Sequence, residues 1–156
     1  MIEPAHRHPW KISDVVMFPL LAIGIALEVF YPSRPENWIN IVTVVSGIFI
    51  VFLGFRMINW AKASLDAANQ PTLPGTPTTQ LITSDAFSFC RNPNYLGAIL
   101  VALGITVLSQ SLWFLGLTLL GTALLDRWMI APEERYLRQV FGDEYEAYCA
   151  KVRRWI

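Results

Sequence analysis

A short polar segment with the sequence R-N-P-N-Y-L-G occupies residues 91–97, directly before the longest uncharged run of the chain. Its two asparagine amides can donate and accept hydrogen bonds, its arginine offers a planar cationic fork, and its tyrosine carries a hydroxyl group on an aromatic ring. Pro93 disfavours a helical conformation at Asn92 and suits the first turn of a helix that begins near Asn94. Because the free N–H groups of a helix start attract anionic groups, the segment predicts either a ligand-binding turn or a polar cap at a membrane interface.

The composition of the chain is that of a membrane protein. Of its 156 residues, 54% are hydrophobic and only 15% are charged, and the apolar residues form long blocks. The net charge is zero and no basic helix or stacking platform is evident, so nucleic acid is not an expected partner. Cys90 and Cys149 match no metal-ligand spacing, and His6 and His8 lie in a polar tail where solvated histidines are common, so no metal is expected either.

Four apolar segments predict an all-α integral membrane protein with four transmembrane helices, at about residues 15–30, 38–58, 95–108 and 112–130. The last two derive from one uncharged run, residues 95–125, which would measure about 46 Å as a single helix and exceed a hydrocarbon core of about 30 Å. Ser109-Gln110-Ser111 interrupts the run. We therefore expect the last two helices to form a hairpin.

Two features of these segments concern packing and chemistry. Small residues that let membrane helices approach one another occur at Gly97, Gly104, Gly116 and Gly121. Glu28 lies near the far end of the first segment, where an acid either reaches the membrane interface or marks a functional position inside the bundle. Its place near the helix end favours the interface.

The polar segments supply a loop and a peripheral helix. Residues 62–85 are rich in proline, glycine and threonine near their centre and predict a non-membrane loop. Pro132 suits the first position of a new helix, and the carboxylates of Glu133 and Glu134 then fall in its first turn. Apolar residues continue at helical spacing to the basic end of the chain. This pattern predicts an amphipathic C-terminal segment that lies on the membrane and carries two carboxylates to its surface.

Lysine and arginine indicate the orientation of the chain, because they concentrate on the cytoplasmic side of membrane proteins. Two precede the first span (Arg7 and Lys11), three lie between the second and third (Arg56, Lys62 and Arg91), and six follow position 126, against Arg34 alone on the other side. Both termini and the central loop are therefore expected in the cytoplasm. We expect one domain, with residues 1–60 as two anchoring spans and residues 61–156 as the loop, hairpin and C-terminal helix.

Two motifs together resemble a known family. The first is L-I-T-S-x-x-F-x-x-x-R-N-P-N-Y-L-G from Leu81, and the second is E-E-R-Y-L-x-x-x-F-G-x-x-Y-x-x-Y-x-x-x-V-R-R-W from Glu133. With a helical hairpin between them, they resemble the membrane methyltransferases related to isoprenylcysteine carboxyl methyltransferase and the phospholipid methyltransferases. The resemblance covers nearly half of the chain. It implies an enzyme that uses S-adenosyl-L-methionine at the cytoplasmic membrane face, on a lipid-like or small apolar acceptor.

The resemblance also implies the residues of the site. Cofactor contacts carried over from the family motifs fall on Leu81, Ile82, Phe87, Asn92, Pro93, Asn94, Tyr95 and Glu133. Arg91 and Glu134 are the candidate catalytic residues, since a carboxylate can pair with the ammonium group of the cofactor and an arginine with a carboxylate.

This sequence departs from the family pattern at three positions. Asn92 replaces the usual histidine, Asp85-Ala86 replaces a frequent Gly-Pro, and Met129 stands where the isoprenylcysteine enzymes have an arginine implicated in substrate binding. The nearest arginine is Arg127, which an α-helix would rotate by about 200° from that position. We therefore expect Arg127 to pair with Asp126 or the headgroup region, and the acceptor to bind without a dedicated carboxylate clamp.

Two alternatives remain open from the sequence. Sterol-type reductases that use NADPH resemble this chain in an Arg-x-Pro-Asn-Tyr turn, although they typically have an acid where this chain has Ala98. A non-catalytic membrane scaffold would also be compatible with the departures, because a fold can be kept without its activity. Methyl transfer itself is an in-line displacement that mainly needs donor and acceptor held together away from water.

Overall fold

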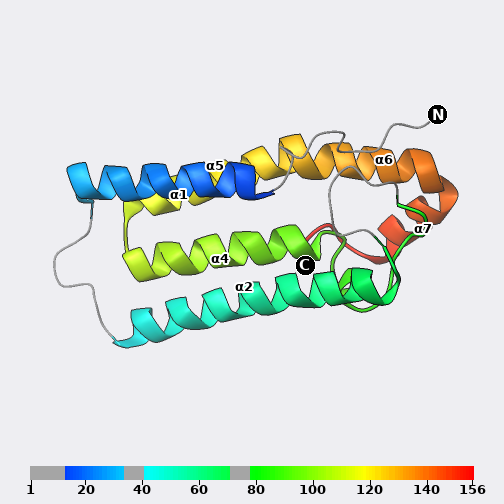
Figure 1. Ribbon diagram of the computed structural model, residues 1–156, viewed down its shortest axis with the longest axis horizontal. Coiled ribbons are helices and arrows are strands. Elements are labelled where there is room, and N and C mark those ends of the chain that lie inside the picture. Colours follow the sequence, from blue (N-terminus) through cyan, green and yellow to red (C-terminus); the bar gives the residue numbers. More distant parts are fainter. Residues whose placement is uncertain (1–12, 34–40, 71–77) are drawn as a thin grey trace.

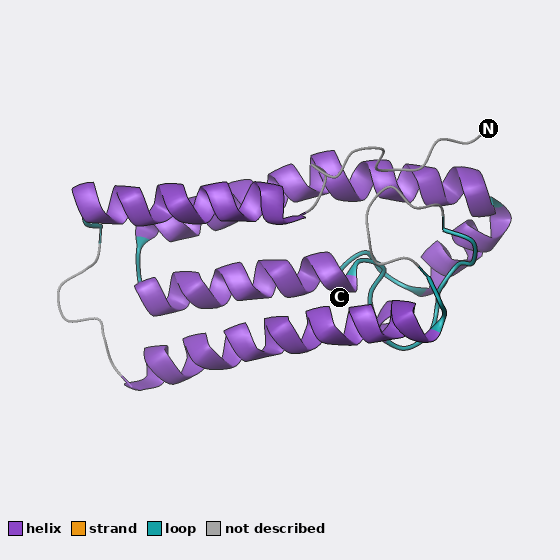
Figure 2. Cartoon of the chain, viewed as in Figure 1, coloured by secondary structure: helices purple, strands orange, loops and turns teal. Residues whose placement is uncertain are grey.

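The computed structural model describes residues 13–33, 41–70 and 78–156, and in these parts the regular elements are all helices, with no strand among them (Figures 1 and 2). The elements in chain order are α1 (Ser13–Phe30), α2 (Ile41–Ala67), α3 (Ala86–Phe89), α4 (Pro93–Ser109), α5 (Leu112–Leu125), η1 (Asp126–Ile130), α6 (Ala131–Phe141) and α7 (Asp143–Lys151). The all-helical expectation is thus confirmed. The predictions that concern His6, His8, Arg7, Lys11 and Arg34 lie outside the described residues.

The long helices form two pairs that lie side by side (Figure 1). The most extensive contacts join α2 to α4, while α1 packs on α5, and the α4–α5 hairpin connects the two pairs. Beyond α5 the chain continues through η1 and α6, and α7 folds back toward the loop that precedes α4. The polar segments of the chain therefore gather at one end of the bundle.

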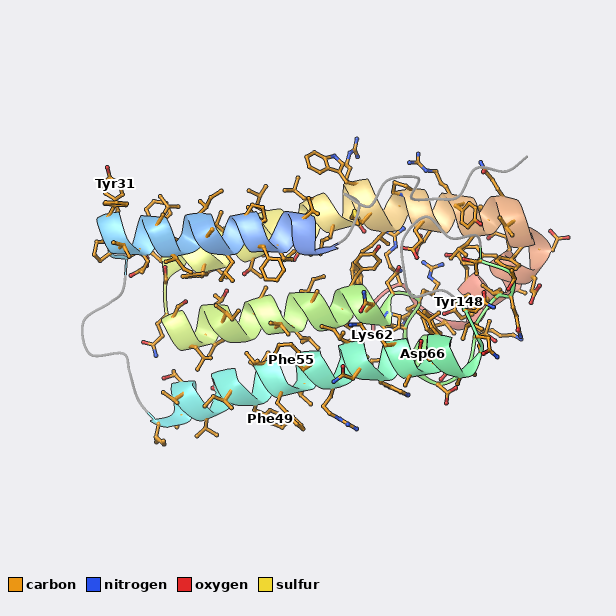
Figure 3. All side chains as sticks on the ribbon, viewed as in Figure 1. Tyr31, Phe49, Phe55, Lys62, Asp66 and Tyr148 are labelled. Atoms are coloured by element: carbon orange, nitrogen blue, oxygen red, sulfur yellow. The ribbon has the colours of Figure 1, made fainter. Side chains whose placement is uncertain are left out.

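Among the described residues, two helices are long and apolar enough to cross a membrane, Ile41–Ala67 and the continuous stretch Leu112–Phe141. The helices α1 and α4 are also apolar but shorter. Large apolar side chains cover the outside of α2, such as Phe49 and Phe52, which are each 56% exposed. Figure 3 shows Phe49 pointing away from the neighbouring helices. Such a surface suits contact with lipid, because it would be unfavourable in water.

The helices α2 and α4 pack at backbone contact through two pairs of glycines. A methyl group on Gly97 would come within 2.8 Å of the carbonyl oxygen of Gly54, and one on Gly104 within 2.9 Å of that of Gly47. The two glycines of each helix are seven residues apart, Gly47 and Gly54 on α2 and Gly97 and Gly104 on α4, which places both contacts on one face of each helix. The predicted close packing is confirmed at Gly97 and Gly104, whereas Gly116 has open space around its Cα.

The hairpin lies where the sequence predicts it. Gln110 has a left-handed conformation (φ 52°) and ends α4, and α5 begins two residues later. The amide nitrogen of Gln110 donates to the carbonyl of Thr106 at 2.9 Å, and its side chain donates to the hydroxyl of Thr43 at 2.8 Å. Gln110 at the break thus forms hydrogen bonds with its own helix and, across the end of the bundle, with α2.

Helix α2 is longer than the predicted second span. The sequence predicted a helix to about residue 58 and a loop from Lys62, but α2 continues to Ala67. The extra residues are good helix formers, and the hydroxyl of Ser64 donates to the carbonyl of Trp60 within the same helix at 2.8 Å. Figure 3 shows Lys62 and Asp66 on this polar last part of α2. Apolar content alone underestimates the length of a helix that extends beyond the hydrocarbon region.

The predicted helix start at Pro132 is confirmed only in part, because the α-helix α6 begins at Ala131 with Pro132 in its first turn, but α5, η1 and α6 form one continuous helix. Proline lacks an N–H group and its ring clashes with the carbonyl of the preceding turn, so it normally breaks a helix. Here the turn before it is a π-turn, in which Ala131 donates its amide to the carbonyl of Asp126, five residues earlier. The wider turn lets the helix pass the proline.

Of the two placements considered for Glu28, the structure shows the one that faces the inside of the bundle. Its side chain is only 6% exposed, and its carboxylate accepts hydrogen bonds from the hydroxyl groups of Ser33 and Ser111. The Ser33 hydroxyl oxygen also accepts the amide of Leu112 at 3.1 Å. The carboxylate thus joins the end of α1 to the start of α5, at the end of the bundle opposite the polar segments.

Candidate active site

The R-N-P-N-Y-L-G segment forms a turn that leads into α4. Pro93 is the first residue of the helix, as predicted, and Asn92 before it is extended enough (φ −128°, ψ 56°) to stay outside. The carbonyl of Asn92 accepts the amide of Leu96 at 2.9 Å, and the amide of Arg91 donates to the carbonyl of Arg153 at 2.9 Å. The turn is therefore fixed by its own helix and by the C-terminal residues of the chain.

Glu134 on α6 is the centre of the site. Its side chain is buried, and its Oε1 atom accepts hydrogen bonds from the amide of Asn92 and from Nε of Arg154, both at 3.2 Å. The guanidinium of Arg91 lies 3.4 Å from the same oxygen, and Nη2 of Arg154 donates to Oε2 at 2.6 Å. A buried carboxylate needs such partners, because burial without them is costly.

Arg154 links Glu134 to a second carboxylate. Its Nη1 atom donates to Oδ1 of Asp126 at 2.9 Å, so all three nitrogens of the guanidinium are used. The hydrogen bond from Arg154 to Glu134 raises the pKa of the guanidinium above its usual value, which favours the charged form. Asp126 therefore does not pair with Arg127, whose side chain is exposed. The expected opposite faces of Arg127 and Met129 are confirmed, because Met129 is buried.

The π-turn brings Asp126 and Glu134 onto one face of their helix. Residues eight apart in a regular α-helix are rotated by about 80° from each other. A π-turn takes up about one additional residue, which removes about 100° and leaves a difference of about 20°. Without this turn, a single guanidinium could not easily reach both carboxylates.

A second contact between the turn and α6 lies beside the first. The hydroxyl of Tyr95 donates to Oε2 of Glu133 at 2.9 Å. The structure thus brings together Arg91, Asn92, Tyr95, Glu133 and Glu134, which are five of the predicted site residues.

Arg91 has unused hydrogen-bonding capacity. Its side chain is 14% exposed, and its only ion pair among the described residues is the 3.4 Å contact with Glu134. Its Nε atom is buried and has no hydrogen-bond partner in the described part of the chain. Because a buried donor without a partner is unfavourable, this nitrogen is available for an acceptor that a ligand would bring.

A small apolar core supports the site from the side of α7. Tyr145 and Tyr148 pack with Leu81, and the hydroxyl of Tyr148 donates to the carbonyl of Phe87 at 2.6 Å. Figure 3 shows Tyr148 where α7 meets the segment before α4. Burial raises the pKa of both phenols, so they remain neutral. Of the predicted cofactor contacts, Leu81 thus belongs to this core, and Phe87 is tied to it through its backbone.

The remaining predicted positions lie around the turn. Ile82 and Asn94 are half-buried, and Pro93 is buried. Cys90 is buried beside the turn, and burial raises the pKa of its thiol.

The Asp85-Ala86 departure keeps the backbone geometry of a glycine. Asp85 has φ 52° and ψ −122°, a region that residues other than glycine rarely adopt. Ala86 is fully buried, and its amide donates to the hydroxyl of Ser64 at 3.4 Å. The loop therefore takes a glycine-type bend at a position where the family often has glycine.

Sequence reasoning missed Arg154, Asp126 and Tyr148 as parts of the site. Arg154 was assigned only to a basic chain end, although it belongs to the V-R-R-W part of the second motif. No local signal joins it to Asp126, which lies 28 residues earlier. Tyr148 had a signal, because the Y-x-x-Y spacing of the same motif places it on one face with Tyr145.

An apolar cavity of about 230 Å³ lies between the two helix pairs. Its lining includes Leu20 of α1, Phe55 and Ile58 of α2, Ala98 and Val101 of α4, and Phe114 of α5. Ala98 follows Tyr95 by three residues, so one end of the cavity lies about one helical turn from the site. The site thus has a charged side and an apolar side.

The described residues form an all-helical bundle that has two helices able to span a membrane and a polar site at one end. Residues 37–144 match the family described as phospholipid methyltransferase, and the chain belongs to this family of membrane methyltransferases. An uncharacterized protein of Haemophilus influenzae is 43% identical over 63 residues, which cover 40% of this chain and 98% of that protein. No solved structure matches the chain.

Proposed function

We propose that the protein transfers a methyl group from S-adenosyl-L-methionine to a lipid-like or small apolar acceptor at the cytoplasmic membrane face. The observation that carries this proposal is a buried carboxylate beside an arginine that has an unused hydrogen-bond donor. Glu134 is buried within reach of Arg91, whose Nε atom has no partner among the described residues. The amino acid end of S-adenosyl-L-methionine carries an ammonium and a carboxylate, which complement the Glu134 carboxylate and the Arg91 guanidinium.

The residues divide into roles that follow from their positions. Glu134 would accept the ammonium group, and Arg91 would bind the carboxylate through its free Nε atom. Asn92, Asn94, Tyr95 and Glu133 would contact the polar parts of the cofactor, and Leu81, Ile82, Phe87 and Pro93 its apolar parts. Bound S-adenosyl-L-methionine would supply an electrophilic methyl group on a sulfonium. The chain's own residues would orient the reactants and exclude water.

The apolar cavity supports an acceptor with an apolar part. It lies one turn from Tyr95 and is lined by side chains that would exclude water. Met129 is buried where an arginine could have bound a carboxylate, and Arg127 points away, so recognition would depend on apolar contacts rather than on a carboxylate clamp.

Binding of S-adenosylhomocysteine to the purified protein in detergent tests the proposal. We expect the wild type to bind it in a calorimetric titration and not to bind NADPH. Asn92→Ala, Glu133→Ala and Glu134→Gln should each weaken binding by about 1 to 3 kcal/mol, because each leaves a buried polar partner unsatisfied. Glu144→Gln is the control, since Glu144 is exposed on α7.

Other binding results would support one of the alternative functions. Binding of NADPH alone would support a reductase, and binding of neither compound would support a non-catalytic scaffold. If the protein binds S-adenosylhomocysteine, a labelled methyl donor should transfer label to membrane lipid extract. Efficient methylation of a farnesylcysteine analogue that is lost in Arg127→Ala would instead show that a carboxylate clamp exists.

A further inference from the structure

The five residues after α7, which we call the C-terminal strap (residues 152–156), return to the site. Val152 leaves the helix in an extended conformation (φ −120°, ψ 128°), and the next carbonyl, that of Arg153, accepts the amide of Arg91 at 2.9 Å. In Figure 1 the chain end lies beside the first turn of α4. The strap lies beyond residues 37–144, the part of the chain that matches the family.

We infer that Arg154 of the C-terminal strap is a positioning residue, which holds the Glu134 carboxylate in the orientation that accepts the ammonium group of the cofactor. The inference rests on the proposed function, because it assigns a role toward the same cofactor. It goes beyond that function by naming a residue that neither the predicted site nor the family match includes.

The geometry of the contact supports a positioning role. Arg154 binds both oxygens of Glu134, at 3.2 Å and 2.6 Å, and a two-point contact with a planar guanidinium fixes the rotation of a carboxylate. Asn92 and Arg91 both contact Oε1 only. Within the described part of the chain, Oε2 is therefore held by Arg154 alone.

The second carboxylate fixes the arginine in turn. Asp126 accepts Nη1 of Arg154 at 2.9 Å, and the π-turn places Asp126 on the same helix face as Glu134. Two carboxylates on one face repel each other, and the guanidinium between them offsets this repulsion. Arg154 is thus anchored to the first residue of the π-turn and to Glu134 in the helix that follows, and it cannot rotate without breaking a contact to Asp126.

Arg154 also keeps Arg91 available. If Arg154 were absent, Arg91 would be the remaining cation in contact with Glu134, and a buried carboxylate would draw it into a closer pair. The Arg91 guanidinium would then no longer be free to bind the carboxylate of the cofactor. Loss of Arg154 should therefore weaken both contacts to the amino acid end of the cofactor and leave its nucleoside end unaffected.

Affinities for two compounds distinguish this role from a structural one. S-adenosylhomocysteine carries the amino acid end, and 5′-methylthioadenosine lacks it. For Arg154→Gln we expect binding of the first to weaken about 10- to 100-fold, the range for loss of a charge-assisted hydrogen bond, and binding of the second to stay within about twofold. Arg153→Gln is the matched control, since its side chain is exposed and its carbonyl is unchanged.

A double-mutant cycle tests whether Arg154 acts through Glu134. If it does, Arg154→Gln combined with Glu134→Gln should bind S-adenosylhomocysteine no more weakly than Glu134→Gln alone. Additive losses, a parallel loss of 5′-methylthioadenosine binding, or an unchanged Arg154→Gln would overturn the inference.

Two further results keep the test decisive. If Arg154→Gln does not fold, Arg154→Lys replaces it, because lysine keeps the charge but cannot bind both oxygens of Glu134 in one plane. It should weaken S-adenosylhomocysteine binding about tenfold and spare 5′-methylthioadenosine, and wild-type affinity would overturn the inference. A wild type that binds neither compound would overturn the proposed function itself, whereas wild-type binding with an unchanged Arg154 variant overturns only the role of Arg154.

Discussion

Adding a single methyl group at Gly97 should separate α2 from α4. The new Cβ atom of Gly97→Ala would lie 2.8 Å from the carbonyl oxygen of Gly54 and 3.0 Å from the amide nitrogen of Ile58. Both are backbone atoms that cannot rotate away. To lengthen the 2.8 Å contact with the Gly54 oxygen to an ordinary contact of 3.4 Å, the helices must move apart by about 0.6 Å.

The cost follows from two opposing effects. Overpacking a tight contact destabilises by about 1 to 3 kcal/mol, whereas alanine in place of glycine in a helix stabilises by about 0.5 to 1 kcal/mol. The two ranges leave a net loss of about 0 to 2.5 kcal/mol, so we expect Gly97→Ala to lower the free energy of unfolding by about 1 kcal/mol. Because Gly97 follows Tyr95 by two residues, the same movement should also displace the turn and weaken S-adenosylhomocysteine binding.

Unfolding in mixed detergent and sodium dodecyl sulfate, followed by circular dichroism, measures this effect. Gly116→Ala is the matched control, since no atom lies within 4 Å of its added methyl group and only the helix-stabilising effect remains. The two variants should therefore change stability in opposite directions. If Gly97→Ala unfolds no more easily than Gly116→Ala, the backbone contact between α2 and α4 is not as close as described.

Two further variants test the ends of the structure. Glu28→Ala should reduce stability by about 1 to 3 kcal/mol, because the hydroxyl groups of Ser33 and Ser111 lose their acceptor, yet it should leave S-adenosylhomocysteine affinity unchanged at the opposite end. A change in that affinity would show that the two ends are coupled. Asp85→Gly should raise the midpoint of thermal unfolding, because relief of a strained backbone (about 1 to 3 kcal/mol) exceeds the entropic cost of glycine. An unchanged or lower midpoint would mean that Asp85 is not strained.

Much of the fold could be predicted because its signals are local. Long uncharged blocks indicate apolar helices, Pro93 marks a helix start, and the polar residues at 109–111 mark a break, since each acts within a few residues of itself. The number of membrane crossings remains a prediction, because two of the four apolar helices are short. The extension of α2 to Ala67 was missed since polar helix formers look like a loop when only hydrophobicity is considered.

Some residues of the candidate site could be predicted from the two motifs, but the contacts between them could not. Arg91 and Glu134 stood out as charged residues in two motifs, yet the sequence could not show that Arg91 and Arg154 both contact Glu134. The pair of Asp126 with Arg154 depends on where the chain returns after α7, and adjacent Arg127 was the simpler partner to expect. The continuous helix was missed because proline usually ends one, and a π-turn depends on packing as well as on sequence.

If the continuous helix from Leu112 to Phe141 crosses a membrane, its length also fixes the distance between the bilayer and the site. From Leu112 to Glu134 a helix rises about 33 Å, close to a hydrocarbon thickness of about 30 Å. Because a rod rather than a flexible loop joins the two ends, the depth of Glu134 relative to the headgroups depends on membrane thickness and helix tilt. A thinner bilayer would leave the carboxylates further out in water, and a thicker one would draw them toward the apolar region from which a lipid acceptor would come.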